Sequence, residues 1–454
     1  MSTVNEFSYR TRKLQLGEIA GTRVRVLIVG GGIVGAGVAN ILAQNGLQPV
    51  LVEKGDFASG TSSGSSKLIH GGLRYISQGK FMLVRELLRE RNYLLRKTDL
   101  VKKLNFDIIV DDYSWGRASI RAGLLLYGIL GSHPGIPRWN RNNGKYPDKV
   151  SGYFSYWDGV ADDASLVIHN IASAQKNGAR CLNYTELKAV SRNSRGFTAR
   201  LADRFTGGEI AIEADAVVNC AGPWAMKVAE MCGITEGGEF RLSKGVHIVV
   251  ARNVVPVQDA VVFRSHLDRR QMFVIPRGRV VIIGTTDEFV DRPDDFSIPE
   301  EHTDYIIRSA ARLFPSVTHE SILTSYAGIR PLFGRGKSAG SVSREFSVSV
   351  HGKFISVFGG KLTDYRSASR KVASVLARAS GIKIRTKGLP VVDYVRQGIG
   401  DNPYDYSIMY ECAMTFEDIA RRRFGLSIYS EDLGESEKGK IEAALEKHFG
   451  SVLK

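Results

Sequence analysis

The sequence predicts an α/β fold in which a Rossmann-like domain is interwoven with an antiparallel-sheet domain and followed by a short helical C-terminal segment. Three observations predict it. An apolar strand near the start of the chain runs directly into a glycine-rich turn and a helix. Two later strands also end in paired small residues. Between them lie β-branched segments separated by turn residues, which are typical of antiparallel sheet.

The composition is that of a globular protein. The 454 residues, 43% hydrophobic and 24% charged, suit two or three domains. The net charge of +15 favours anionic partners, although we expect most of the 62 Lys and Arg residues to be solvated. The four cysteines form no C-x-x-C pair, so we expect no metal site and a reducing compartment. No apolar run approaches the roughly 18 residues of a membrane span, and we expect no signal peptide.

The first strand, Val24 to Val29, is short, apolar and rich in β-branched residues, as a buried parallel strand is. A G-x-G-x-x-G pattern follows it and opens a helix, and the next strand ends in an acidic residue. In this context the pattern predicts a dinucleotide site, because the glycines admit a pyrophosphate to the helix N-terminus and the acid binds the ribose hydroxyls. The residues expected here are Gly30, Gly32, Ile33, Gly35 and Glu53.

Two later junctions favour FAD over NAD. The strand within 214–225 ends in Ala221–Gly222, and the strand within 353–366 ends in Gly359–Gly360 before a helix that begins near Thr363. Three strand–glycine junctions in one chain indicate a large ligand that is contacted at several places. A helix N-terminus near Thr363 also suits negative charge on a flavin.

The motifs around these junctions resemble a known family. "GTSSGSSKLIHGGLRY", "GPW", "KGVHIVV", "VIIGTTDE", "GIRPL" and "FGGKLTDYR" follow one another as in the FAD-dependent glycerol-3-phosphate dehydrogenases, which are D-amino-acid-oxidase-like flavoproteins. The resemblance covers about residues 24–380. It implies oxidation of sn-glycerol 3-phosphate to dihydroxyacetone phosphate, with a hydride passing from C2 to FAD N5 and the electrons going on to a quinone-type acceptor.

The resemblance also implies the remaining cofactor residues. The serine-rich half of residues 62–75 is expected to bind the pyrophosphate and the flavin edge, because hydroxyl and amide donors suit a diphosphate that is shielded from water. The "HGGLRY" half is expected to face the substrate. The further cofactor-binding residues are Thr61, Ser62, Ser66, Lys67, Leu68, Val190, Ala221, Gly222, Gly359, Gly360, Leu362 and Thr363.

A phosphorylated alcohol requires cationic groups for the phosphate and a proton acceptor near the hydroxyl. The expected substrate-binding residues are Arg74, Tyr75, His247, Arg330, Arg344 and Lys361. Of these, we expect His247, Arg330 and Lys361 to be catalytic. His247 is our choice of general base because the ordinary pKa of histidine lies near neutrality. His70 and a pocket arginine are alternatives, and Asp287 is expected to order the arginines; each cation alone is equally consistent with a structural ion pair.

The motifs divide the chain into interleaved pieces. We assign residues 24–97, 152–239 and 340–385 to the FAD-binding domain and residues 98–151 and 240–339 to the substrate domain. Residues 386–454 resemble a truncated helical cap, since most relatives carry a larger one. We hypothesise that a partner or a homodimer contact covers the face that the shorter cap leaves exposed.

Residues 113–146 combine basic side chains with Trp115 and Trp139 around an apolar run. This combination suits a helix lying on anionic lipid, although a core helix fits equally well. The family implies a peripheral protein on the cytoplasmic face of the membrane, with a quinone or a partner protein accepting the electrons; a cytoplasmic location is the alternative.

Other functions remain open at this point. A glycerol-3-phosphate oxidase, with oxygen as acceptor, has no motif that separates it from a dehydrogenase. An amino-acid or 2-hydroxy-acid flavin oxidase needs about one arginine for its carboxylate, whereas several cations are expected here. A nucleic-acid-binding protein is disfavoured because the basic residues are dispersed.

Overall fold

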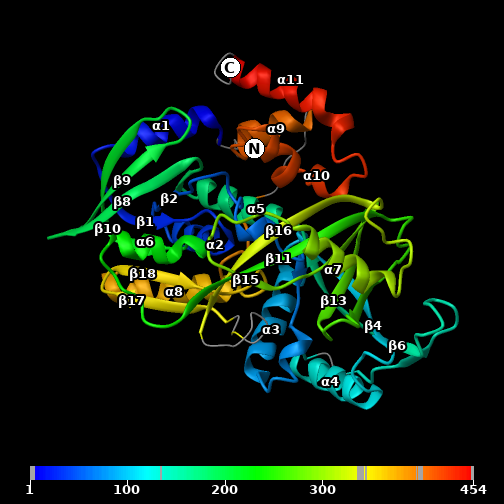
Figure 1. The fold of residues 1–454 in the computed structure, drawn as a ribbon. Coiled ribbons are helices and arrows are strands. Elements are labelled where there is room, and N and C mark those ends of the chain that lie inside the picture. The colour runs from blue at the N-terminus through cyan, green and yellow to red at the C-terminus, as the bar shows by residue number, and fades with distance from the viewer. Residues whose placement is uncertain are drawn as a thin grey trace.

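The computed structural model describes residues 6–132, 135–334, 342, 345–394, 396 and 402–450. Two β-sheets form the centre of the molecule, and helices pack on their faces (Figure 1). The first sheet is largely parallel around its centre, and the second is mostly antiparallel. This arrangement confirms the predicted α/β fold class.

The first sheet consists of β1 (Arg23–Val29), β2 (Val50–Val52), β7 (Arg180–Leu182), β8 (Thr185–Asn193), β9 (Gly196–Asp203), β10 (Glu209–Asn219), β17 (Ser347–His351) and β18 (Phe354–Phe358). Among the described residues its main order is β17-β18-β10-β1-β2-β7. β1 is parallel to β2 and β10, and Val29 lies beside both Val52 and Asn219. β18 is parallel to β10. The turns that follow β1, β10 and β18 therefore meet at one edge, which is where parallel sheets bind ligands.

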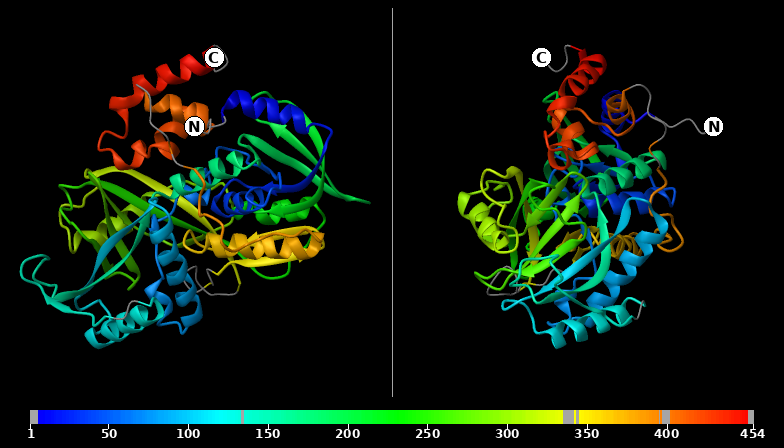
Figure 2. Two further views of the ribbon diagram at one scale, coloured as in Figure 1. Left: turned by 180° about the vertical axis from the view of Figure 1, so that it is seen from behind. Right: turned by 90° about the vertical axis from the view of Figure 1, so that its right-hand side faces the viewer.

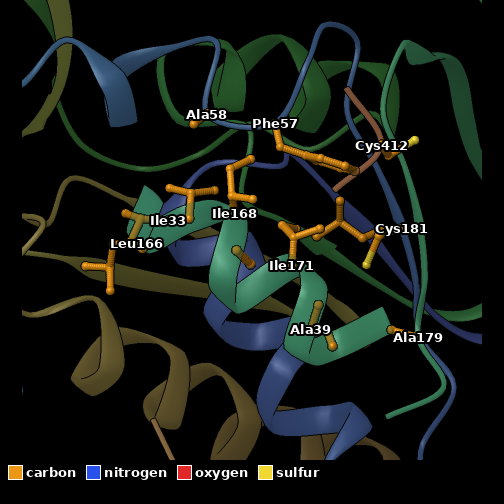
Figure 3. Close-up of a cluster of buried hydrophobic side chains, with 14 of the residues drawn as sticks. Ile33, Ala39, Phe57, Ala58, Leu166, Ile168, Ile171, Ala179, Cys181 and Cys412 are labelled. Carbon is orange, nitrogen blue, oxygen red and sulfur yellow. The ribbon is translucent and has the colours of Figure 1, made fainter. Parts of the chain in front are cut away.

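Helices cover both faces of this sheet. Those on one face are α2 (Ile33–Ala43), α5 (Asp163–Lys176) and α8 (Tyr365–Ser380), and those on the other are α1 (Tyr9–Ile19) and α6 (Ala225–Met231). Alternation along β1 explains the two layers: Val26 and Ile28 belong to the first apolar cluster, whereas Leu27 and Val29 belong to the second. Figure 3 shows part of the first cluster, where side chains of α2, α5 and β7 come together.

The second sheet consists of β3 (Leu68–Ile69), β4 (Val101–Val110), β5 (Trp139–Arg141), β6 (Gly152–Ala161), β11 (Phe240–Ala251), β12 (Ala260–Arg264), β13 (Gln271–Arg277), β14 (Val280–Gly284), β15 (Glu288–Val290) and β16 (Ile322–Phe333). The long strands β11 and β16 pair with each other and form its part nearest the first sheet (Figure 1). The hairpin expected near Arg277–Gly278 is confirmed, since β13 and β14 pair antiparallel across this turn.

The division of the chain into domains stays a prediction, but two segments lie differently from it. Residues 152–161, which we assigned to the FAD-binding domain, form β6 and pair with β4 along ten positions of the second sheet. Leu68–Ile69 pairs with β6. The strand pairing places both segments in the second sheet, which we call the substrate sheet because most of its strands come from the predicted substrate domain. The helices that pack against this sheet or its edge are α3 (Phe81–Lys97), α4 (Arg117–Leu130) and α7 (Glu300–Ala311).

The C-terminal segment is helical, as expected. It contains α9 (Pro403–Tyr410), the π-helical turn η4 (Asp418–Arg423), α10 (Leu426–Tyr429) and α11 (Lys438–Phe449). Figure 2 shows these elements gathered on one side of the molecule, close to α1. The amide of Phe7 donates to the carbonyl of Met409, and the amide of Cys412 donates to the carbonyl of Phe7. The two ends of the chain therefore hold each other.

A buried ion cluster fastens η4 to the first sheet. Nε of Arg422 and Nη1 of Arg423 each lie 2.7 Å from Oδ2 of Asp56, and all three side chains are buried. Burial alone raises the pKa of Asp56, but the charges of Arg423 and Arg422 outweigh burial and lower this pKa to about 2. Asp56 lies between Glu53 and the serine-rich loop, so the C-terminal segment supports the site-forming part of the chain.

Candidate active site

A cavity of about 530 Å³ opens at the edge where the three glycine turns meet. Its wall includes most of the expected cofactor residues: Gly30, Gly32, Ile33, Glu53, Thr61, Ser62, Ser66, Leu68, Ala221, Gly222, Gly359, Gly360, Leu362 and Thr363. The expected substrate residues in the wall are Arg74, Tyr75, Arg330 and Lys361. Segments separated by more than 300 positions in the sequence thus form one cavity.

The turn after β1 packs closely against the turn after β10 and against the start of α2. Gly30 has φ +109°, and a Cβ there would lie 2.4 Å from the carbonyl oxygen of Cys220. A Cβ at Gly35 would lie 2.0 Å from the carbonyl oxygen of Gly30, so Gly35 packs the helix against the turn instead of lining the cavity. Gly32 precedes the first residue of α2, and the amide of Ile33 donates to Oγ of Ser62 at 2.9 Å.

The carboxylate of Glu53 holds the same turn through hydrogen bonds to the backbone. Its carboxylate accepts from the amides of Gly31 at 2.7 Å and Gly55 at 2.9 Å. Burial raises the pKa of Glu53, and these two amide donors counteract that rise. Its position in the cavity wall fits the role expected from the sequence.

Four expected residues lie outside the wall, Gly35 among them, and a fifth lies outside the described residues. Lys67 has φ +59°, is 1% exposed and turns its Nζ to Oδ1 of Asp163 at 2.5 Å, so this ammonium is committed to a buried ion pair. Val190 is buried within the first sheet, whereas Thr185, Glu186 and Leu187 of β8 line the cavity. His247 is also behind the wall. Arg344 lies outside the described residues.

The serine- and glycine-rich loop is held from both sides. The amide of His70 donates to Oγ1 of Thr363 at 3.0 Å. The amide of Gly71 donates to the hydroxyl of Tyr127 at 2.8 Å, and this hydroxyl donates to Asp158 at 2.6 Å. Asp158 in turn pairs with Arg91 at 2.7 Å. This buried network fixes the backbone of the loop, and it comes from α3, α4 and β6 of the substrate side.

One cationic wall is formed by β13 and β16. Nη1 of Arg330 lies 3.1 Å from Oδ1 of Asp287, and Nη2 donates to Oγ1 of Thr285 at 3.1 Å. The guanidinium of Arg330 packs against the backbone of β11 at Gly245. A Cβ at this glycine would lie only 2.1 Å from Nη2 of Arg330. Nη1 of Arg270 lies 3.6 Å from the other oxygen of Asp287. Asp287 thus orients two arginines, which is the role expected for it.

Arg270 is a residue that the sequence analysis missed. Its side chain lines the cavity. It is the residue directly before β13, in the segment "RRQMF", and this segment has no sequence pattern that indicates ligand binding. The pairing of β13 with β14 brings it near Asp287, the residue that Arg330 also contacts. A guanidinium with contacts of 3.4 to 3.6 Å, as Arg270 has, is held less tightly than Arg330.

A second cationic group comes from the loop after β18. Nζ of Lys361 lies 3.8 Å from the ring centre of Tyr75, a cation–π contact. The amide of Lys361 donates to Oδ1 of Asp364 at 2.7 Å. Burial raises the pKa of Asp364 to about 7, and this amide counteracts the rise. Gly72, with φ +70°, lets the chain turn so that Tyr75 faces the cavity.

His247 lies one layer behind the cavity. Its Nε2 is 2.8 Å from Oγ of Ser66, which lines the cavity, and its ring stacks on Tyr326 at 4.9 Å. Nδ1 is buried without a hydrogen-bond partner in the described structure. Burial, followed by the charges of Arg330 and Lys67, lowers the pKa of His247 well below its usual value. The imidazole is therefore neutral near pH 7, and its hydrogen bond with Ser66 connects it to the cavity wall.

The parallel sheet, the glycine turns and the cationic cavity define a dinucleotide-binding oxidoreductase. The chain belongs to the FAD dependent oxidoreductase (DAO) family, whose profile matches residues 25–363.

Relatives of known name agree with this assignment. The chain is 38% identical over 367 residues to a glycerol-3-phosphate dehydrogenase of Pseudomonas aeruginosa, a match that covers 77% of this chain and 71% of the relative. It is 35% identical over 363 residues to the D-erythritol 1-phosphate dehydrogenase of Brucella abortus, covering 76% and 72%. The crystal structure of a glycerol-3-phosphate dehydrogenase from Bacillus halodurans, complexed with FAD, superimposes with a TM-score of 0.77 at 25% identity, covering 97% of this chain and 94% of that one.

The residues present fit FAD. Gly30, Gly359 and Gly360 line the cavity with left-handed backbone, which glycine adopts without strain. A Cβ at Gly30 or Gly359 would contact the neighbouring backbone of Cys220 or Glu345, so these glycines let the turns around the cavity pack closely. The N-terminus of α2 begins at the wall, where its amides suit a pyrophosphate. The cavity volume lies in the range of about 300–1,000 Å³ that is typical of ligand and cofactor sites.

Proposed function

We propose that this protein oxidises sn-glycerol 3-phosphate to dihydroxyacetone phosphate with FAD as the hydride acceptor. The observation that carries the proposal is a single cavity that joins three glycine turns to Arg74, Arg330 and Lys361. The names of relatives that match most of the chain support the substrate class. An amino-acid or 2-hydroxy-acid substrate needs about one guanidinium for its carboxylate and leaves the remaining cations unused.

The side chains of the cavity have distinct tasks in this proposal. Arg330, fixed by Asp287 and Thr285, presents a planar fork of donors to an oxyanion. Arg74 and Lys361 supply further positive charge from the opposite loops, with Lys361 as a point charge over Tyr75. Bound FAD supplies the group that accepts the hydride. The buried loop anchored by Tyr127 holds the wall in place and keeps water from that face.

The proton of the substrate hydroxyl leaves through Ser66 and His247. Ser66 lines the cavity, and its Oγ lies within hydrogen-bond distance of Nε2 of His247. A neutral imidazole accepts a proton, and its lowered pKa keeps it neutral at working pH. His70 is the alternative acceptor, because it lines the cavity itself.

Anaerobic bleaching of the flavin absorbance tests the function. Purified protein is titrated with glycerol 3-phosphate and, separately, with D-erythritol 1-phosphate, glycerol, lactate and an amino-acid mixture. We expect bleaching by glycerol 3-phosphate and none by the unphosphorylated compounds. Bleaching by D-erythritol 1-phosphate alone contradicts the proposed substrate, and bleaching by lactate or an amino acid contradicts the phosphate-binding role of the cations.

We also propose a quinone as the electron acceptor. Reoxidation of the bleached protein under argon by a soluble quinone, with little peroxide formed when oxygen is admitted, is the expected result. Rapid reoxidation by oxygen with stoichiometric peroxide contradicts this part and favours the oxidase. The reoxidation rate is measured after the flavin has been reduced, so it does not depend on which substrate reduced it.

We further propose that the end of the molecule formed by α3 and α4 contacts an anionic membrane. Figure 1 shows these two helices side by side at one end. Exposed fractions are 61% for Ile129, 74% for Ile136 and 74% for Met82. The exposed basic residues of α4 and the segment up to residue 146 are Arg117, Arg121, Arg138, Arg141 and Lys145. Basic and apolar side chains on one surface suit adsorption to anionic lipid.

The tryptophans expected to anchor this surface are half-buried. Trp139 lies under the guanidinium of Arg117 at 3.8 Å, and Trp115 lies under Arg264 at 4.8 Å. In the part of the chain that the structure describes, no helix is both long enough and apolar enough to span a bilayer.

Co-sedimentation with vesicles that contain anionic lipid tests this contact. We expect binding at low salt that decreases at high salt and that is weakened by Ile129→Asp. Leu14→Asp, which alters a 66% exposed residue of α1, is the matched control. No binding at low salt removes the proposal. The homodimer expected from the short cap stays a prediction, and gel filtration at several concentrations tests it.

A further inference from the structure

Three residues from three segments meet at one end of the cavity, next to Glu53. Lys54 follows β2, Trp224 ends the turn η3 (Gly222–Trp224), and Asp294 lies between β15 and α7. Nζ of Lys54 and Nε1 of Trp224 each lie 3.1 Å from Oδ1 of Asp294. Nζ of Lys54 also lies 3.7 Å from the ring centre of Trp224. All three residues line the cavity.

This contact joins the two sheets. Lys54 and Trp224 are carried by strands of the first sheet, whereas Asp294 is carried by the substrate sheet. The segment that bears Asp294 has a second attachment to its own sheet, since Asp295 pairs with Nζ of Lys244 at 3.1 Å. On the other side, a Cβ at Gly60 would lie 3.3 Å from the Trp224 ring, so the indole rests against the start of the serine-rich loop.

The ion pair between Lys54 and Asp294 is exposed enough to solvent to break easily. The side chain of Asp294 is 61% exposed and that of Lys54 is 34% exposed, and ion pairs with this exposure contribute little to stability. Although partial burial opposes it, the Trp224 and Lys54 donors lower the pKa of Asp294, so the carboxylate stays charged at neutral pH. Lys54 and Asp294 belong to different sheets, and solvent screens the attraction between them. Their contact can therefore break and open this end of the cavity while both sheets stay folded.

We propose that Lys54, Trp224 and Asp294 form a latch that closes the Glu53 end of the cavity over bound FAD. FAD enters and leaves when the Asp294 segment moves away from Lys54 and Trp224. This assigns a cofactor-retaining role to a segment of the substrate sheet, outside the glycine turns. The inference rests on FAD binding and not on the proposed substrate, so it is tested without any substrate.

The experiment measures FAD exchange in the full-length protein. Release is followed by the rise in flavin fluorescence after dilution of holoprotein, and binding by the quenching of flavin fluorescence on mixing FAD with apoprotein. In Asp294→Ala we expect both rates to increase, release by about fivefold, which is the size of effect that an exposed ion pair supports. High salt should accelerate release from the wild-type protein and leave Asp294→Ala unchanged.

Asp393→Ala is the matched control, because it removes a 3.0 Å ion pair with Lys176 of similar exposure that lies outside the cavity. We expect its rates to equal those of the wild-type protein. Trp224→Phe, which keeps the ring and removes the N–H donor, should give an intermediate effect. Thermal unfolding of each apoprotein shows that the variants fold.

Two outcomes overturn the inference. Unchanged exchange rates in Asp294→Ala show that the contact does not control the cavity. A faster release with an unchanged binding rate also overturns it, because a direct contact with FAD has this signature, whereas removal of a latch accelerates passage in both directions.

Discussion

Oγ of Ser66 lies 2.8 Å from Nε2 of His247, so this histidine, which lies behind the cavity wall, contacts a serine that lines it. In the proposed reaction this pair takes the substrate proton. We expect His247→Gln to slow anaerobic flavin bleaching by about 10²–10⁴-fold, the usual contribution of a general base. Stopped-flow absorbance measures the rate, and flavin content should not change.

His169→Gln, which alters a half-buried histidine outside the cavity, is the control and should bleach at the wild-type rate. A His247→Gln protein that unfolds more easily yet bleaches at the wild-type rate would show a purely structural histidine.

The environment of His247 sets the pH dependence. Burial and the charges of Arg330 and Lys67 lower its pKa, so it stays neutral well below the ordinary value near 6.5. We expect the bleaching rate at saturating substrate to be level from about pH 8 to 6.5 and to fall only at lower pH. The same shift lowers the free energy of unfolding as the pH drops below about 6.5, because the unfolded chain binds a proton that the folded protein does not. A rate that halves at pH 7 contradicts the assignment.

Arg330 and Arg270 share Asp287 but are held differently. Arg330→Lys replaces a fork that contacts Asp287 and Thr285 with a single ammonium, so we expect KM for glycerol 3-phosphate to rise by about 10- to 100-fold. Arg270→Lys should raise KM less, because its contacts with Asp287 are longer. Steady-state kinetics with an artificial acceptor measures both. Arg269→Lys, next in sequence but outside the cavity wall, is the control. A larger effect at position 270 than at position 330 would reverse the proposed roles.

Asp56 is the buried anion that holds Arg422 and Arg423. We expect Asp56→Asn to lower the free energy of unfolding by about 3–5 kcal/mol, because the buried guanidinium of Arg423 then lacks its carboxylate partner and that of Arg422 keeps Asp418 as its buried one. Its folded-state pKa of about 2 lies below the ordinary value, so its contribution is complete above about pH 4 and is lost as the pH falls toward 2. Urea unfolding of the apoprotein measures it. Glu213→Gln, which alters an exposed 2.7 Å pair with Arg23, should have a much smaller effect; equal effects would refute the role of burial.

Local patterns made the glycine turns predictable. The residues around Gly30 are contiguous, and strand, turn and helix signals agree there, so the helix start at Ile33 is where the sequence indicates. The later turns at Gly222 and Gly359 were recognisable because each begins within three residues of the end of an apolar strand. The α/β class and the family followed from these motifs.

Residues whose role depends on the fold were harder to predict. Lys67 lies inside a cofactor motif, yet its left-handed backbone turns the side chain toward Asp163, almost 100 positions away. No glycine marks that turn in the sequence. Arg270 becomes a neighbour of Asp287 only through the hairpin of β13 and β14. Val190 was expected in the cofactor site, but the part of β8 that reaches the cavity is at its start, around Thr185.

The order of strands in the first sheet has a consequence for biosynthesis. β1 leaves the ribosome early, but its neighbour β10 ends at Asn219, and the cavity is complete only when Thr363 has emerged. At about 5–20 residues per second, this delay is on the order of 20–70 s. During the first part of this delay, until β7 and β10 have emerged, the outer edges of β2 and β1 lack their partners, and unpaired apolar strands aggregate. We therefore expect the nascent chain to expose these strand edges longer than a chain whose neighbouring strands are adjacent in the sequence, and to bind FAD only after Thr363 has emerged.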